Sequence, residues 1–327
     1  MYRKFYNLTC NPFELSPDPY FFFPTPRHNE ALALLNYGVL RRKGFVVVTG
    51  EVGTGKTLLV RCLLDSLAMH KVAFAYVYNP ILTVQNFLEQ VLGDLGLPVA
   101  SRSKNEALAR LNNYLMTRSR DELTTALIVD EAQLLSWELL EEIRLLTNLE
   151  TTQHKLLQIV LAGQPELDRK LDSHQLRQLK QRVGLRCHLL PLELTEVEGY
   201  IYRRLELAGA KGAEKALFPK ETIQAICHVS KGIPRLVNTL CENALMLGYG
   251  MQARQITPAI VREVASDFRL EQVAAVPVIP SSNNNTEGSE GPTMGLKLLH
   301  RKTREEVGLS SANSAQKTHV QSGMKSE

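Results

Sequence analysis

The sequence has no long apolar run, little cysteine and little charge imbalance. None of its 327 residues lies in an uninterrupted apolar stretch approaching the roughly 18 residues that predict a membrane span. The first residues include basic side chains but lack the apolar stretch of about 7–15 residues that a secretory signal requires. Hydrophobic residues make up 44% and charged residues 22% of the chain, as in ordinary globular proteins. These features exclude a membrane-spanning protein, a collagen-like chain and a chain disordered throughout.

The five cysteines are odd in number, scattered, and form no CxxC pair. This usage is typical of a protein from a reducing compartment, so we expect the cytoplasm. The neighbours Cys187-His188 and Cys227-His228 have no second ligand pair at zinc-site spacing, and adjacent residues of a strand point to opposite faces. We therefore expect buried thiols rather than a zinc site. The net charge of +4 is too small to demand a nucleic-acid partner.

Short β-branched apolar runs alternate with longer segments of helical periodicity across residues 45–194. This alternation predicts an α/β domain whose parallel sheet is covered on both faces. The expected strands are Phe45–Thr49, Val72–Val77, Thr125–Val129, Leu156–Ala162 and Leu185–Leu190. The helices expected between them are Thr57–His70, Thr83–Leu95, Asn105–Arg118 and Trp137–Leu149, the last with Ser136 as its N-cap.

The rest of the chain divides into three parts. Residues 1–44 are rich in aromatic residues and proline, contain a helical patch at Glu30–Leu40, and are expected to pack on the α/β domain. Residues 195–270 contain only helical patterns and predict a small all-helical domain. Its expected helices are Thr195–Ala208, Thr222–His228, Pro234–Leu247 and Thr257–Phe268. Residues 271–327 are polar and have few apolar residues, which predicts a disordered tail.

A glycine-rich loop of the pattern G-x-x-x-x-G-K-T follows the first expected strand. Glycines let its backbone N–H groups point at a β-phosphate, and the next helix directs its positive dipole end to the same place. Lys56 is predicted to contact the β- and γ-phosphates of ATP, and the Thr57 hydroxyl to bind Mg²⁺. The predicted nucleotide-binding residues are Gly50, Glu51, Val52, Gly53, Thr54, Gly55, Lys56, Thr57 and Leu58.

Two carboxylates follow the third expected strand, in the sequence ALIVDE. Asp130 is predicted to hold Mg²⁺ through water, and Glu131 to polarise the water that attacks the γ-phosphate. Their place suits this role, because α/β sheets bind ligands at the carboxyl ends of their strands. A helix-capping Asp-Glu pair is the structural alternative. Gln164, after the fourth strand, is predicted to orient the same water, with a plain turn residue as an equal alternative.

Three arginines are candidates for contact with the γ-phosphate. Leu176–Val183 is expected to form a helix that ends near Arg182, and Arg186 opens the following strand. Either arginine is predicted to act as a finger on a neighbouring subunit's ATP, with an ordinary surface charge as the alternative. Arg235 follows Gly232-Ile233-Pro234 at the start of a helix, from which it can reach phosphate across the domain cleft.

The aromatic residues before the first strand admit two interpretations. Tyr20 and the run Phe21-Phe22-Phe23, together with His28, are candidates for lining an adenine pocket, because aromatic rings stack on bases. Packing in the protein core is the alternative, and we weigh it at least equally.

The glycine-rich loop, the carboxylate pair, Gln164, the arginines and the Gly-Ile-Pro-Arg stretch follow one another in an order that resembles an AAA+ ATPase. The resemblance is closer still to the ExeA/GspA-like secretion ATPases. The likeness covers about residues 1–270. It implies a P-loop NTPase with a five-stranded parallel sheet, a helical lid, and ATP hydrolysis with Mg²⁺ in a homo-oligomer such as a ring. The stretches that carry it include Asn11-Pro12-Phe13, Pro17-Asp18-Pro19, Asp130-Glu131-Ala132-Gln133, Gly163-Gln164-Pro165-Glu166-Leu167, Tyr200-Ile201 with Arg204-Leu205, and Gly232-Ile233-Pro234-Arg235.

The resemblance implies a motor or switch in a secretion or cell-envelope export system, either free in the cytoplasm or peripheral at the inner face of the membrane. Secretion or envelope-assembly proteins are the implied partners. Full-length members of that family continue into a membrane span and a peptidoglycan-binding region. Since the residues after Leu270 contain no such span, we expect a short form, in which the pore-assembly role is in doubt.

Two other function classes are kept as alternatives. Related AAA+ proteins regulate DNA transposition, and such a protein is expected to carry a basic surface. This chain has only scattered basic residues such as Arg41, Arg42 and Lys43, so a nucleic-acid partner is not favoured. A nucleotide-binding scaffold without hydrolysis is the third class, and the intact pair of carboxylates at the third strand weighs against it.

Overall fold

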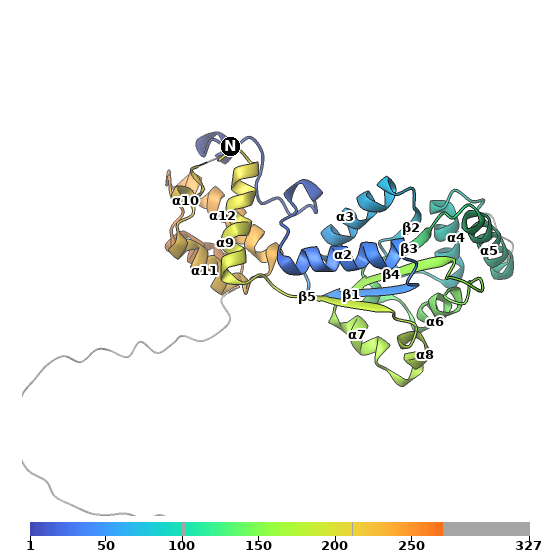
Figure 1. The fold of residues 1–327 in the computed structure, drawn as a ribbon. Helices are drawn as coiled ribbons and strands as arrows, with labels where there is room; N and C mark the ends of the chain where they lie inside the picture. Colours follow the sequence, from blue (N-terminus) through green and yellow to red (C-terminus); the bar gives the residue numbers. More distant parts are fainter. Residues whose placement is uncertain (100–102, 211, 271–327) are drawn as a thin grey trace, which may run out of the picture. The chain divides into compact units, whose positions relative to one another are not determined.

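The computed structural model describes residues 1–99, 103–210 and 212–270. Five parallel strands form one sheet in the order β2-β3-β4-β1-β5 (Figure 1). The strands are β1 (Phe45–Gly50), β2 (Ala73–Val77), β3 (Thr125–Val129), β4 (Leu157–Gly163) and β5 (Leu185–Leu189). The predicted α/β fold with five parallel strands is confirmed. The tail expected over residues 271–327 lies outside the described residues.

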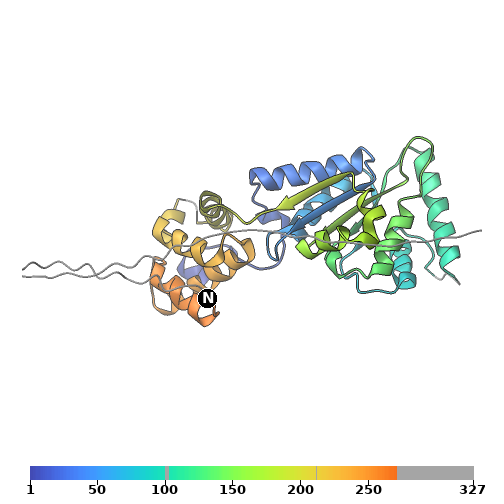
Figure 2. The same cartoon turned by 90° about the horizontal axis from the view of Figure 1, so that it is seen from below.

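Helices cover both faces of the sheet (Figures 1 and 2). One face packs against α2 (Pro26–Leu40) and α3 (Lys56–Met69). The other packs against α4 (Val84–Asp94), α5 (Lys104–Arg120), α6 (Trp137–Leu146), α7 (Pro165–Leu171) and α8 (Arg177–Lys180). The three central strands are buried on both sides along their whole length, which explains why their sequences are continuously apolar.

The strand register gathers the chemically active segments at one edge of the sheet. Val129 of β3 pairs with Leu161 of β4, and Thr49 of β1 pairs with Gly163 of β4. The residues that follow these strands therefore leave the sheet side by side. As a result, the glycine-rich loop, the carboxylate pair and Gln164 meet at the carboxyl ends of three neighbouring strands.

The helical domain consists of α9 (Leu194–Leu207), α10 (Glu214–Leu217), α11 (Lys220–Ser230), α12 (Pro234–Gly250) and α13 (Pro258–Asp267). The four helices expected here are present. The short α10 was not expected, because four residues are too few to show a helical period. None of the helices described in the chain is both long enough and apolar enough to cross a bilayer.

Residues 1–13, which include α1 (Tyr2–Phe5), pack into the core of the helical domain. The expectation that residues 1–44 pack on the α/β domain is therefore wrong for this part, whereas Phe22 and α2 do pack on that domain. Phe13 is fully buried, with its ring 5.9 Å from that of Phe218. The Tyr2 hydroxyl donates to the Glu242 carboxylate at 2.7 Å. The aromatic side chains of this segment thus complete the core of a domain that lies far along the sequence.

The segment before β5 is less helical than expected. A 3₁₀ turn at His174–Leu176 leads into α8, which ends at Lys180 and not at Val183. The Arg182 N–H donates to the carbonyl oxygen of Leu179, three residues back, at 2.9 Å, so the chain tightens and leaves the helix. Arg182 consequently lies in the turn that follows α8.

The buried position of Phe13 predicts a large loss of stability on truncation. We expect Phe13→Ala to lower the free energy of unfolding by about 3–5 kcal/mol, because it leaves a cavity beside Phe218. Urea denaturation followed by circular dichroism measures this. Met69→Ala is the control, because Met69 is 77% exposed and its loss should change stability by less than about 0.5 kcal/mol. Equal stability of the two variants would show that residues 1–13 do not contribute to the core.

Candidate functional site

The loop between β1 and α3 has the backbone shape of a phosphate cradle. Gly53 and Gly55 have φ angles of +82° and +99°, which side chains with a Cβ atom rarely adopt. A Cβ at Gly53 would also lie only 2.7 Å from the Cβ of Arg235. Helix α3 begins at Lys56, so its first backbone N–H groups border the loop. This geometry fits a bound phosphate.

Lys56 is buried beneath this loop. Its Nζ donates to the carbonyl oxygens of Gly50 at 2.8 Å and Glu51 at 2.9 Å. Burial lowers the pKa of Lys56, and the nearby carboxylates of Glu131 and Asp130 act in the opposite direction. The two carbonyl oxygens therefore hold Lys56 Nζ in place at the loop and leave it one further N–H that can donate to a phosphate oxygen.

Thr57 and Asp130, the two predicted metal residues, are in direct contact. The Thr57 hydroxyl donates to Asp130 Oδ2 at 2.8 Å, and Asp130 Oδ1 accepts the Glu131 N–H at 2.9 Å. Burial raises the pKa of Asp130, and the hydrogen bond from Thr57 opposes this. A hydroxyl and a carboxylate held together are oxygen ligands of the kind that Mg²⁺ uses, with water and phosphate oxygens completing its shell.

Glu131 is held by two glutamine amides. Its backbone is left-handed (φ 50°, ψ 36°). Its Oε2 accepts from Gln133 Nε2 at 2.5 Å and from Gln164 Nε2 at 3.2 Å. Gln133 Oε1 in turn accepts the Gln164 N–H at 3.0 Å. Gln133 therefore links the ends of β3 and β4; sequence reasoning missed this role, although Gln133 stands in the motif Asp130-Glu131-Ala132-Gln133.

A cavity of about 270 Å³ lies at these groups; Asp130 and Gln133 do not line it but hold Thr57 and Glu131, which do. The α/β domain contributes Val52, Gly53, Gly55, Lys56, Thr57, Leu58, Glu131 and Gln164 to its lining. The helical domain contributes Tyr200, Arg204, Pro234, Arg235 and Asn238, and the N-terminal segment contributes residues 15–18. Arg235 lies at the loop, where its backbone N–H donates to the Gly53 carbonyl oxygen at 3.2 Å, and contact of its side chain with phosphate stays a prediction.

Three predicted loop residues lie behind the cavity wall. Gly50 and Glu51 supply the carbonyl oxygens that hold Lys56, and the Thr54 hydroxyl donates to the Glu51 carbonyl oxygen at 2.8 Å. His28 supports the loop from below: its Nε2 lies 3.2 Å from the Thr54 carbonyl oxygen, and its Nδ1 lies 2.8 Å from the Thr25 hydroxyl. These residues shape the loop and do not line the cavity.

None of Tyr20, Phe21, Phe22 and Phe23 lines the cavity. Phe21 lies under the Arg204 guanidinium at 4.6 Å, and the Phe23 ring lies 5.9 Å from that of Tyr200. Tyr20 is 61% exposed. The packing alternative therefore describes Phe21 and Phe23 but not Tyr20. Residues 15–18 form the N-terminal wall of the cavity; the sequence predicts no role for them at the site, although Pro17 and Asp18 belong to one of the stretches that carry the resemblance.

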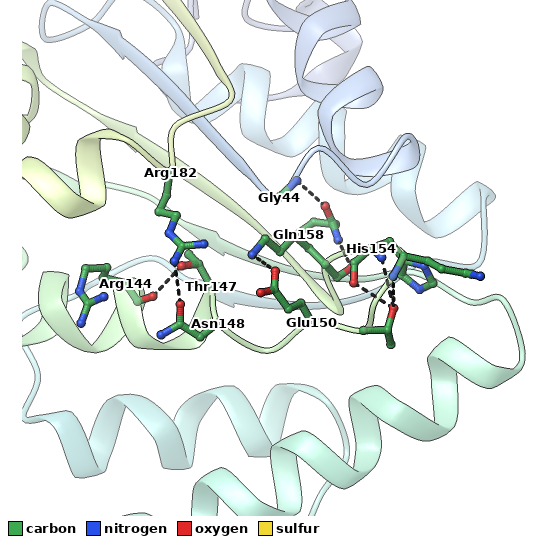
Figure 3. Close-up of polar contacts among 11 residues, drawn as sticks. Gly44, Arg144, Thr147, Asn148, Glu150, His154, Gln158 and Arg182 are labelled. Carbon is green, nitrogen blue, oxygen red and sulfur yellow. Dashed lines mark hydrogen bonds and ion pairs between the residues drawn. The ribbon is translucent and has the colours of Figure 1, made fainter.

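Arg182 and Arg186 do not line this cavity. Arg182 Nη2 donates to Asn148 Oδ1 at 3.1 Å, on the side of the sheet where Gly44 enters β1 (Figure 3). Arg186 forms an ion pair with Asp168 at 3.1 Å. Contact between either arginine and a γ-phosphate would therefore require the site of a neighbouring subunit, and the finger role stays a prediction.

Comparison with known proteins supports the same fold. Residues 40–171 match the family described as an AAA domain. Over 257 residues the chain is 42% identical to general secretion pathway protein A of Aeromonas hydrophila, covering 78% of this chain and 46% of the relative. The chain thus spans about half the relative's length. The predicted resemblance to the GspA proteins is confirmed.

Two solved structures have a similar fold. Cdc6p of Pyrobaculum aerophilum superposes with a TM-score of 0.61 at 20% identity, covering 78% of this chain and 70% of that one. The ORC2 protein of Aeropyrum pernix, in its ADPNP–ADP complexes, gives 0.55 at 17% identity, covering 81% and 74%. At these identities the likeness concerns the fold alone.

The buried His28 predicts a pH dependence of stability. Burial lowers the pKa of His28 below its usual 6.5, although the hydrogen bond to Thr54 acts against this. Unfolded chains then bind more protons than native ones, so the stability from His28 is complete above about pH 6.5 and decreases as the pH falls toward the lowered pKa. We expect the stability difference between wild type and His28→Gln to shrink by up to about 1.4 kcal/mol from about pH 7.5 to about pH 5.5, because only the last pH unit of this window lies below the pKa of the unfolded state. Urea denaturation at both pH values checks this, and a constant difference would contradict it.

Proposed function

Because the chain contains an AAA domain with the P-loop fold, we propose that it binds ATP with Mg²⁺ and hydrolyses ATP to ADP and phosphate. One observation carries this proposal. The phosphate cradle with Lys56, the contact between Thr57 and Asp130, and the amide-held Glu131 converge at one end of a single cavity. These are the parts that phosphoryl transfer to water requires.

Each group has a separate task in this proposal. The N–H groups of the loop and the Lys56 ammonium bind the β- and γ-phosphates, and Thr57 and Asp130 would hold Mg²⁺. The cation, when bound, neutralises charge that develops on the phosphate oxygens. Glu131 accepts a proton from the attacking water, and the Gln164 amide orients that water. Arg235 approaches the γ-phosphate from the helical domain.

The identity with general secretion pathway protein A supports a role in a secretion or cell-envelope export system. In this proposal ATP hydrolysis drives a motor or switch formed by a homo-oligomer of the chain. Its partners are secretion or envelope-assembly proteins. The place of action is the cytoplasm or the inner face of the membrane.

The alternative of a DNA-associated regulator receives less support. Arg42, one of the scattered basic residues, donates to the Thr124 hydroxyl, the Glu122 carbonyl oxygen and His154 within the chain. Its guanidinium is thus committed to the protein. Binding of duplex DNA that weakens steeply with salt would revive the alternative, because phosphate contacts release counterions.

The position of Glu131 predicts the effect of removing its charge. Glu131→Gln should retain ATP binding and lower the turnover number by roughly a hundredfold or more, the scale expected for a positioned general base. Lys56→Ala should instead lose ATP binding. Calorimetry measures affinity, and phosphate release measures turnover. The exposed Glu138, changed to Gln, is the matched control and should leave both unchanged. Unchanged turnover in Glu131→Gln would remove this residue from the mechanism.

A finger in trans predicts complementation between two inactive variants. Arg182→Ala should bind ATP but hydrolyse it poorly, and mixing it with Lys56→Ala should restore part of the activity. The restored sites pair an intact Lys56 with an intact Arg182 from the next subunit. Wild-type activity per subunit should also rise with protein concentration. Arg177→Ala is the control. Full activity of Arg182→Ala alone would make Arg182 a surface charge and transfer the test to Arg186.

A further inference from the structure

Three side chains of the helical domain form a directed chain of hydrogen bonds at the cavity. Arg204 Nη1 donates to the Tyr200 hydroxyl at 2.8 Å, and this hydroxyl donates to Asn238 Oδ1 at 2.8 Å. Arg204, Tyr200 and Asn238 are 4%, 6% and 7% exposed, and all three line the cavity. The array is thus buried yet adjacent to the space that a ligand would fill.

The direction of the chain follows from the chemistry of its first member. A guanidinium can only donate, so the Tyr200 oxygen accepts from Arg204 and its own hydrogen is left to donate. Burial raises the pKa of Tyr200, so the phenol keeps this hydrogen. Tyr200 therefore needs an acceptor in Asn238, which is the carbonyl oxygen. This requirement fixes which way round the Asn238 amide lies.

The Asn238 amide consequently presents its NH₂ group to the cavity. Within the part of the chain that the structure describes, Nδ2 makes no hydrogen bond. Nδ2 is not fully enclosed by protein and is therefore open to the cavity, where a ligand atom that accepts from it would form a hydrogen bond in a partly desolvated site. The cavity thus contains a donor of fixed orientation whose partner is not supplied by the described protein.

The position of Asn238 indicates which part of a nucleotide it meets. Lys56, Glu131 and Gln164 define the phosphate end of the cavity. Helix α12 starts at the loop, where the Arg235 N–H reaches Gly53, and Asn238 lies one turn further along the helix. The lining also includes Tyr200, Arg204, Pro234 and residues 15–18. That part of the cavity is left for the nucleoside.

We propose that Asn238 Nδ2 donates a hydrogen bond to an acceptor atom of the bound nucleoside, either a ring nitrogen of the base or a ribose oxygen, and that Asn238 thereby determines nucleotide specificity. The proposal rests on the proposed function, because it assumes that the phosphates occupy the loop. Arg204 and Tyr200 act as positioning residues, since they orient the amide without being required to touch the ligand.

Calorimetric titration tests the proposal with wild type and Asn238→Leu, a substitution of similar size that cannot donate. The ligands are ATP, 2′-deoxy-ATP and deaza analogues that each replace one ring nitrogen by carbon. We expect Asn238→Leu to bind ATP about tenfold or more weakly, the scale of a lost buried hydrogen bond. One analogue should bind wild type about tenfold or more weakly than ATP does. The same analogue should bind Asn238→Leu with the affinity that this variant has for ATP. A deaza analogue would identify the base, and 2′-deoxy-ATP the ribose.

Controls separate this inference from the proposed function. Asn243→Leu, on the same helix but outside the cavity lining, should bind ATP as wild type does. Asn238→Asp keeps the acceptor for Tyr200 and replaces the donor, so it gives the same test if Asn238→Leu does not fold. Equal affinity of wild type and both Asn238 variants, or a loss that no analogue shares, would overturn the inference. Absence of ATP binding by wild type would overturn the proposed function itself, and this inference with it.

Discussion

A guanidinium buried in a protein is stable only where its N–H groups meet acceptors, and Arg204 satisfies this condition by fixing the N-terminal segment to the helical domain. It donates to the carbonyl oxygens of Pro12 and Glu14 and to the Tyr200 hydroxyl, and its plane lies over the Phe21 ring. The chain runs from these carbonyls directly into residues 15–18 of the cavity wall. One buried charge therefore fixes a wall of the site and the orientation of a side chain within it.

The phosphate end of the cavity depends on a different balance. Burial disfavours the charged forms of both Lys56 and Asp130, and their opposite charges partly offset this cost. The parallel register places these two charges close together, because it brings the ends of β1 and β3 to the same edge of the sheet. The Glu131 carboxylate lies at the same cavity, where its left-handed backbone and two amide donors hold it. The two ends of the site are thus held by separate networks in separate domains.

Sequence alone predicts the features whose signal is local. The five strands lie within one residue of their expected bounds, and the glycine loop, Asp130 and Glu131 follow from a motif and a strand end. The cavity lining by Arg204 and Asn238 was not predictable, because it depends on contacts between residues about 190 positions apart. On α9, Tyr200 and Arg204 belong to a stretch that carries the resemblance, but their helical spacing suits a core-facing or a solvent-facing side equally and assigns them no role at the site. The helix predicted over Leu176–Val183 is longer than α8, because the apolar spacing of the sequence continues after the backbone has left the helix.

The packing of residues 1–13 on the helical domain has a consequence for biosynthesis. Tyr6 and Phe5 find their partners Ala253 and Arg254 only after almost 250 further residues have left the ribosome. The α/β domain, whose strand–helix units close over shorter distances, can fold in the meantime. The aromatic side chains of residues 1–13 therefore remain without their native core partners until the helical domain has been synthesised. A circular permutant that joined residues 1–13 behind α13 would make the helical core contiguous in sequence and shorten that wait.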